Sequence, residues 1–157
     1  MRAFGHPLHP AVVHFPIALL GTSLAFDLIG VLREESVWWS ISYWNIALGL
    51  VAAAVAAVTG LSDALSIEND PPATRKAIRH LVVVVLAVSC YGVSLAVRHG
   101  PQTPEGSAFG WTLALEALGL GLLLVGGWLG AELVYGSAEP AEAAPAGIAA
   151  ADHPPRH

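Results

Sequence analysis

The fold is decided by the first long apolar stretch of the chain, residues 11–32, which reads AVVHFPIALLGTSLAFDLIGVL. Three more stretches of this kind follow, at residues 41–65, 77–97 and 110–135. Each exceeds the roughly 18 apolar residues that indicate a membrane-crossing helix. The pattern therefore predicts an all-α integral membrane protein, a four-helix bundle with four transmembrane helices surrounded by the lipid bilayer.

The composition supports the same fold class and excludes several functions. Hydrophobic residues make up 55% of the chain and charged residues only 12%, whereas soluble domains carry about 25% charged residues. No basic patch suggests a nucleic-acid partner. The single cysteine, Cys90, lies in the middle of a span, which rules out an intramolecular disulfide and a cysteine-based metal motif.

The basic residues predict how the bundle is oriented. With four spans, the N-terminus, the second loop and the C-terminal tail lie on one side, which holds Arg2, Arg75, Lys76, Arg79 and Arg156. The other side holds only Arg33 and Arg98. Because Lys and Arg are enriched in cytoplasmic loops, both termini are predicted to be cytoplasmic. An aromatic belt is predicted at the outer membrane interface, formed by Trp38, Trp39, Tyr43, Trp44, Phe109 and Trp111.

Two segments flank the membrane domain of residues 11–135. Residues 1–10 form an N-terminal His/Pro segment, whose His6 and His9 are interpreted mainly as headgroup-region residues. Residues 136–157 are rich in Ala and Pro and cannot bury a core, so a disordered tail is predicted.

Polar side chains are predicted to meet at two depths in the bundle. The antiparallel order of the spans brings His9, His14, Asp63, Arg79 and His80 to a similar depth near the cytoplasmic side. The outer half contains a second set: Asp27, Asn45 and Glu116. Ionisable groups inside spans are costly and mark a pathway or a site by default. Helical spacing also places His80, Ala87, Tyr91 and Arg98 on one face of the third span.

The N-terminal motif carries a family resemblance. Residues 9–17 read His-Pro-x-x-Val-His-Phe-Pro-Ile, and a Gly-x-x-Asp follows at Gly60 to Asp63. A basic residue, Arg75 or Lys76, precedes His80 at the entry to the third span. With four spans after the opening motif, the chain resembles an uncharacterised bacterial family of predicted membrane proteins, a domain-of-unknown-function family. The resemblance implies the four-helix architecture and a multi-pass location in the bacterial cytoplasmic (inner) membrane, and it brings no settled activity.

The leading functional hypothesis is a membrane protein that binds one b-type haem in an electron-transfer or redox-associated role. Membrane haem b is commonly held by one histidine from each of two helices. His14 and His80 would be the axial ligands, and Arg75 or Arg79 would meet the propionates. The small residue Gly21 would leave room for the macrocycle.

Two alternatives belong to other classes. A divalent transition metal could be bound or transported by His9, His14, Asp63 and His80, with Asp27 and Glu116 extending the path. The chain could instead be an accessory subunit of a larger membrane complex, or a homo-oligomer, with histidines that only form hydrogen bonds. No nucleophile–base pair, phosphate loop or acid pair with catalytic spacing is present, so an autonomous hydrolase or transferase is not expected.

Overall fold

The four predicted spans are present as four long helices. The structure is a computed structural model and describes residues 2–3, 6–65 and 71–135; the predicted tail at 136–157 lies outside them. Its elements are β1 (Arg2–Ala3), β2 (His6–Pro7), α1 (Leu8–Val12), α2 (His14–Arg33), α3 (Ser36–Ala64), α4 (Pro71–Arg98) and α5 (Ser107–Tyr135). Four helical stretches are long and apolar enough to cross a membrane. This confirms the all-α, four-span prediction.

Helices α3, α4 and α5 begin before the apolar stretches that predicted them. The turn between α2 and α3 contains only Glu34 and Glu35, and Glu34 adopts a left-handed conformation with φ 58°. Helix α3 therefore starts at Ser36 and includes two tryptophans that were expected in a loop. Helix α4 starts at Pro71, because proline is tolerated in a first helical turn. Hydropathy marks the apolar middle of a helix but does not mark its ends.

The first span is interrupted near its start. Helix α1 ends at Val12 and α2 begins at His14, although the amide of Ile17 still donates to the carbonyl of Val13. Pro16 has no amide hydrogen, so the carbonyl of Val12 lacks its usual helical donor. The break therefore falls one turn before Pro16, and residues 9–33 still act as a single span.

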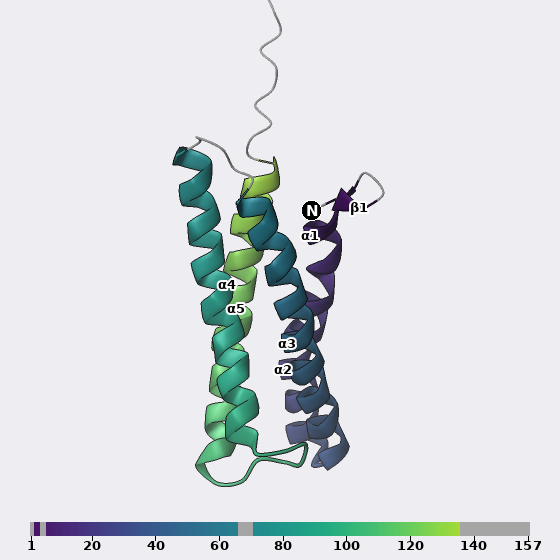
Figure 1. The fold of residues 1–157 in the computed structure, drawn as a ribbon. Helices are drawn as coiled ribbons and strands as arrows, with labels where there is room; N and C mark the ends of the chain where they lie inside the picture. The colour runs from purple at the N-terminus through teal and green to yellow at the C-terminus, as the bar shows by residue number, and fades with distance from the viewer. Residues whose placement is uncertain (1, 4–5, 66–70, 136–157) are drawn as a thin grey trace, which may run out of the picture.

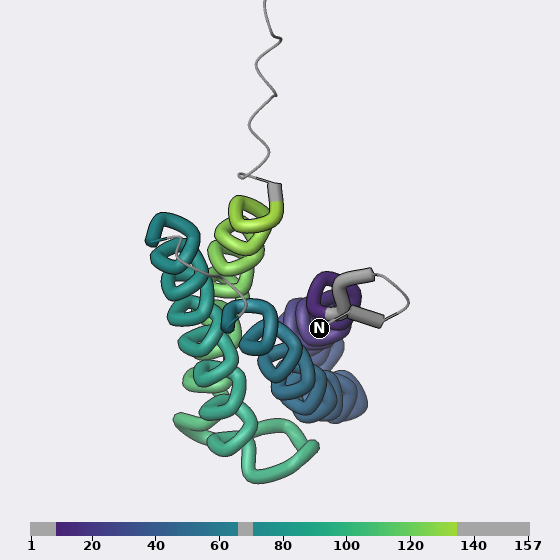
Figure 2. The backbone as a smooth tube through the Cα atoms, turned by 45° about the horizontal axis from the view of Figure 1, so that its top comes forward, coloured from purple at the N-terminus to yellow at the C-terminus, as the bar shows by residue number. Residues whose placement is uncertain are grey.

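The helices form two antiparallel hairpins that lie side by side (Figures 1 and 2). Helices α2 and α3 form the first hairpin, and α4 and α5 form the second. The hairpins meet where α3 packs against α4 and where α2 packs against α5. We call the end that contains His9 and Pro71 the terminal end. The opposite end, with the α2–α3 turn and the α4–α5 loop, is the turn end.

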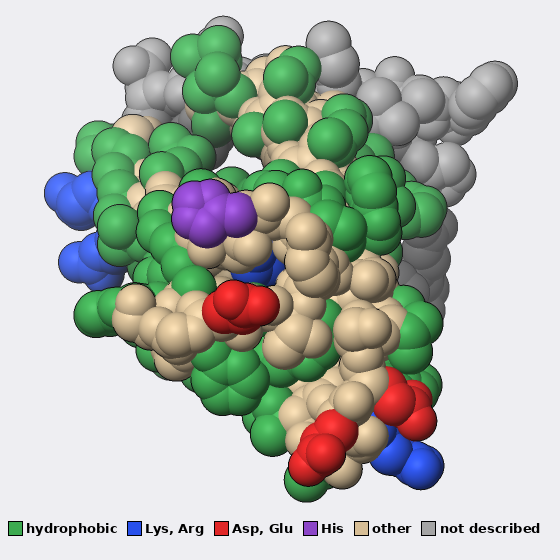
Figure 3. Space-filling view, turned by 90° about the horizontal axis from the view of Figure 1, so that it is seen from below, with side chains coloured by type: hydrophobic (Ala, Val, Ile, Leu, Met, Phe, Trp, Pro, Cys, Tyr) green, Lys and Arg blue, Asp and Glu red, His purple; other side chains and the backbone are tan. Residues whose placement is uncertain are grey.

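The centre of the bundle is apolar, and so is most of its outside. Leu20, Ile46 and Tyr91 are fully buried and form the central cluster. Large side chains such as Leu124 and Trp128 point outward and are exposed, as expected where lipid surrounds the helices. Acidic, basic and histidine side chains reach the surface at the turn end (Figure 3). The buried charges lie between this end and the central cluster.

Candidate functional site

A buried arginine contacts two buried carboxyl groups near the turn end of the bundle. Arg98, at the end of α4, pairs through Nη2 with Asp27 of α2 and with Glu116 of α5. The exposed fraction of all three side chains is 0%. The contact joins the two hairpins, because Asp27 belongs to the first hairpin while Arg98 and Glu116 belong to the second.

Hydroxyl groups complete the surroundings of these charges. Ser94 Oγ donates to Glu116 Oε1 at 2.9 Å. Ser23 Oγ lies 3.2 Å from Glu116 Oε2 and 2.8 Å from the carbonyl oxygen of Leu20, to which it donates. Helix α3 contributes as well, because Arg98 Nη2 lies 3.2 Å from Ser42 Oγ. All four long helices therefore supply a polar group to the same buried site, which we call the Arg98 site.

Helical spacing explains why these residues converge. Ser23 and Asp27 are four residues apart on α2, and Ser94 and Arg98 are four apart on α4. Residues at this spacing share one helix face. In both helices this face points into the bundle, and the same face carries the apolar cluster one turn deeper.

The charges at the Arg98 site do not balance if all three groups are ionised. One guanidinium faces two carboxylates, and both contact the same nitrogen atom, Nη2 of Arg98. Two ionised carboxylates in contact repel each other, and each can only accept hydrogen bonds. Within the described part of the chain, three buried oxygens of this region lack a hydrogen-bond partner: Asp27 Oδ1, Tyr91 Oη and Thr112 Oγ1.

An aromatic pair covers the site toward the turn end. Arg98 lies over the ring of Trp39 at 5.6 Å from its centroid, and Phe109 packs against the same ring at 5.5 Å. Gly30 makes this possible, because a Cβ there would lie 2.7 Å from Trp39 Nε1. Trp39 is therefore buried, which corrects its predicted place in an aromatic belt. Trp44 and Trp111 are exposed, as that belt requires.

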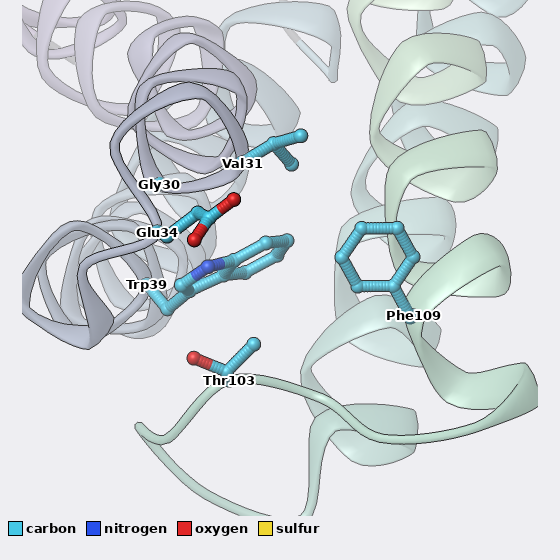
Figure 4. A pocket seen from close by; sticks show the side chains of 6 residues that line it. All are labelled: Gly30, Val31, Glu34, Trp39, Thr103 and Phe109. Atoms are coloured by element: carbon cyan, nitrogen blue, oxygen red, sulfur yellow. The ribbon is translucent and has the colours of Figure 1, made fainter.

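A cavity of about 300 Å³ lies on the other side of this aromatic cover (Figure 4). It is lined by Gly30, Val31, Glu34, Trp39, Thr103 and Phe109. The ring of Trp39 lies between the carboxylate of Glu34 and the hydroxyl of Thr103, which comes from the α4–α5 loop. The ring of Trp39 thus contacts Arg98 and also lines this cavity.

The histidines predicted to form one pocket have different partners. His9 Nδ1 lies 3.0 Å from the carbonyl oxygen of Ala56, and His80 Nδ1 lies 2.9 Å from that of Gly126. His14 is exposed and its Nδ1 lies 3.4 Å from a carbonyl oxygen of its own span. His9 and His80 therefore each form a hydrogen bond between the two helices of one hairpin.

The remaining residues of the predicted cofactor site lie apart from a common pocket. Arg75 and Arg79 are exposed, and Asp63 is half-buried near the end of α3. A Cβ on Gly21 would lie 3.9 Å from Leu120, so this glycine faces α5. Among residues 9–65 and 71–134, no three His, Cys, Asp or Glu side chains are grouped as a metal ion requires. A haem at His14 and His80 stays a proposal, tested by an absorption spectrum and metal analysis of one purified sample.

Comparison with known proteins places the chain in a family. The profile of the predicted membrane proteins designated DUF2231 matches residues 5–138. The chain belongs to this family. No curated protein and no solved structure matches it. The function of this DUF2231 protein must therefore be inferred from its own residues.

The sequence predicted part of the Arg98 site but missed its centre. Asp27 and Glu116 were expected in one cluster, and the structure brings them together. Asn45 is not part of it, because its amide donates to Thr22 at 3.1 Å on a more exposed face. Arg98 was counted as an outer charge at a helix end. Arg98 lies on the same helix face as Tyr91, about two turns further along, and this spacing was the signal that Arg98 points inward.

Proposed function

We propose that this protein is a proton-binding membrane protein, in which Asp27 and Glu116 hold one exchangeable proton beside Arg98. The observation that carries the proposal is the ratio of charges in a fully buried site, one guanidinium to two carboxyl groups. A net charge inside a membrane-spanning bundle is costly. One bound proton makes the site neutral.

The hydrogen bonds indicate which carboxyl group carries the proton. Glu116 accepts through Oε1 from Arg98 and from the hydroxyl of Ser94. Hydrogen bonds to a carboxylate favour its ionised form. Asp27 accepts from Arg98 alone and its Oδ1 has no partner. We therefore assign the proton to Asp27 and the negative charge to Glu116.

The surroundings favour proton exchange with the turn end. The apolar cluster of Leu20, Ile46 and Tyr91 separates the Arg98 site from the terminal end. On the other side the ring of Trp39 contacts Arg98 and also lines the cavity, and Phe109 packs against that ring. Loss of the proton would leave a negative charge between the hairpins, which weakens their contact. Proton occupancy is thus linked to the way the two hairpins pack, and the protein can respond to pH from one side of the membrane.

Infrared spectroscopy of the purified protein tests this proposal. A protonated carboxylic acid has a carbonyl band that is well separated from the bands of carboxylates. We expect the native protein to show this band at neutral pH. Asp27→Asn and Glu116→Gln should each remove it, because one remaining carboxylate balances the single guanidinium.

The exposed residue Glu132 supplies the matched control. It pairs with Lys76 at 3.1 Å and both side chains are 43% exposed, so Glu132→Gln should leave the band unchanged. If the native protein lacks the band, both carboxyl groups are ionised and Arg98 serves only as a structural ion pair. A band that persists in both Asp27→Asn and Glu116→Gln would arise elsewhere and would refute the assignment.

We further propose that the terminal end faces the cytoplasm of a bacterial cell. Three basic residues, Arg75, Lys76 and Arg79, lie at this end. At the turn end Arg98 is neutralised by its two partners, which leaves Arg33 as the exposed basic residue among those described. This asymmetry supports the orientation.

Thiol labelling of intact cells tests this orientation. Cys90 is the one cysteine of the chain, so Cys90→Ser provides a background without thiols. In that background an impermeant thiol reagent should label Arg33→Cys and should not label Arg75→Cys until the cells are lysed. The reverse pattern would place the terminal end outside.

A further inference from the structure

The two hairpins repeat one sequence pattern. Residues 21–25 of α2 read GTSLA and residues 92–96 of α4 read GVSLA, which is a shift of 71 positions. Residues 47–50 of α3 and residues 117–120 of α5 both read ALGL, which is a shift of 70 positions. The first match joins α2 with α4, and the second joins α3 with α5. These are the first helices and the second helices of the two hairpins, which run in the same direction.

The interhelical histidine contacts repeat with the same shifts. In the first hairpin His9 contacts the carbonyl oxygen of Ala56 through Nδ1. In the second hairpin His80, 71 positions later, contacts that of Gly126, 70 positions later, also through Nδ1. Each contact joins a side chain of one helix to a backbone atom of another helix. Its recurrence therefore shows that the two helices pack in the same way in both hairpins, in addition to having similar sequences.

The close helix approaches repeat as well. In each hairpin, two glycines of the second helix leave space for side chains of the first. A Cβ at these glycines would lie within 2.7–3.0 Å of the facing side chain. Gly60 faces His9 and Gly130 faces His80, while Gly49 faces Leu20 and Gly119 faces Tyr91.

Equivalent residues meet at the boundary between the hairpins. Trp39 and Phe109 differ by 70 positions and pack ring against ring. Ser23 and Ser94 differ by 71 positions, and their hydroxyl oxygens lie 3.2 Å and 2.9 Å from the two oxygens of one carboxyl group, that of Glu116. Such contacts between equivalent positions are expected around a twofold axis that runs between the hairpins.

One equivalent pair differs in charge. Asp27 and Arg98 occupy corresponding positions, again 71 residues apart, and they form an ion pair with each other. We propose that the chain is a tandem duplication of a two-helix unit, and that Asp27 and Arg98 determine that unlike halves pair. Two first hairpins would bury two acids at this contact with no cation between them, which carries a like-charge penalty. Two second hairpins would bring two guanidinium groups together, each beside the Glu116 of its own hairpin. Asp27 therefore meets a cation only in an unlike half.

This pseudo-symmetry also accounts for the position of the Arg98 site. In membrane proteins built from repeats related by an axis along the membrane normal, binding sites lie at the interface between repeats. The inference rests on packing and sequence, so it stands whether or not the site binds a proton.

Exchange of the two charges in the full chain tests the proposal. Asp27→Arg alone sets two guanidinium groups against one carboxyl group, and Arg98→Asp alone leaves three carboxyl groups without a cation. Each single variant should lower the ratio of folded to unfolded protein by roughly 100-fold or more. The double variant Asp27→Arg/Arg98→Asp restores the pair in mirrored positions and should recover to within roughly tenfold of the native ratio.

A milder exchange keeps the test informative if the charge variants do not fold. Trp39→Phe/Phe109→Trp preserves the aromatic pair across the axis, so this double variant should be more stable than either single variant. If both exchanged doubles are no more stable than their single variants, the positions are not equivalent and the duplication is refuted. The readout is unfolding in mixed detergent micelles followed by circular dichroism.

Discussion

Replacement of Arg98 by methionine is the perturbation that the structure predicts most sharply. Arg98→Met keeps an unbranched side chain but removes the guanidinium that contacts Asp27, Glu116 and the hydroxyl of Ser42. The two carboxyl groups then stay buried with no cation beside them. Removal of one partner from a buried ion pair typically costs about 3–5 kcal/mol, so we expect a loss of this size in the free energy of unfolding.

The loss in the free energy of unfolding should depend on which charges remain at the site. In the triple variant Asp27→Asn/Arg98→Met/Glu116→Gln no charge is left at the site. Because fully neutral replacements of buried ion pairs are often neutral in stability, the triple variant should recover at least about half of the loss. This non-additivity separates an electrostatic effect from a cavity, since the cavity is the same in both variants.

The assay is reversible unfolding in mixed micelles of increasing denaturing-detergent content, followed by tryptophan fluorescence. Arg33→Met is the matched control, because Arg33 lies at the same end of the bundle but is exposed. Its effect should stay within about 0.5 kcal/mol. A loss below about 1 kcal/mol for Arg98→Met, or a triple variant no more stable than the single one, would refute the reasoning.

Two further predictions concern the contacts within each hairpin. Gly49→Ala should destabilise the protein by about 1–3 kcal/mol, because the added Cβ would lie 2.7 Å from Leu20 Cδ2. Gly121→Ala, with nothing within 4 Å of its Cβ, should be neutral or slightly stabilising in the same unfolding assay. His80→Ala should cost about 0.6–1.7 kcal/mol through the lost interhelical hydrogen bond. His14→Ala, at an exposed position, should stay within about 0.5 kcal/mol, and equal effects of the two substitutions would contradict the assignment of separate partners.

The depth of each polar residue could be predicted from the sequence, but its direction around the helix could not. Topology alone set His14 and His80 at similar depth, yet the break near Pro16 and the packing of α4 on α5 turn them toward different partners. Asp27 and Glu116 were predicted together because both depth and charge singled them out. Arg98 was missed because it is the last residue of α4. A basic residue directly after an apolar stretch is usually assigned to the following loop.

The repeat shows a similar limit. The paired GTSLA and GVSLA segments are visible in the sequence, but small and apolar residues are common in every membrane span. The contacts of His9 and His80 show that these matches reflect a repeat, and such contacts can be seen only in the structure.

Solid-state NMR of the protein in lipid bilayers tests the central claim most directly. The carbon chemical shifts of the Asp27 and Glu116 carboxyl groups report protonation, and dipolar couplings report their distances from the Arg98 guanidinium nitrogens. We predict an acid-form shift for Asp27, a carboxylate shift for Glu116, and strong couplings of both carbons to Arg98. Two carboxylate shifts at neutral pH, or the absence of coupling from either carbon, would contradict the account.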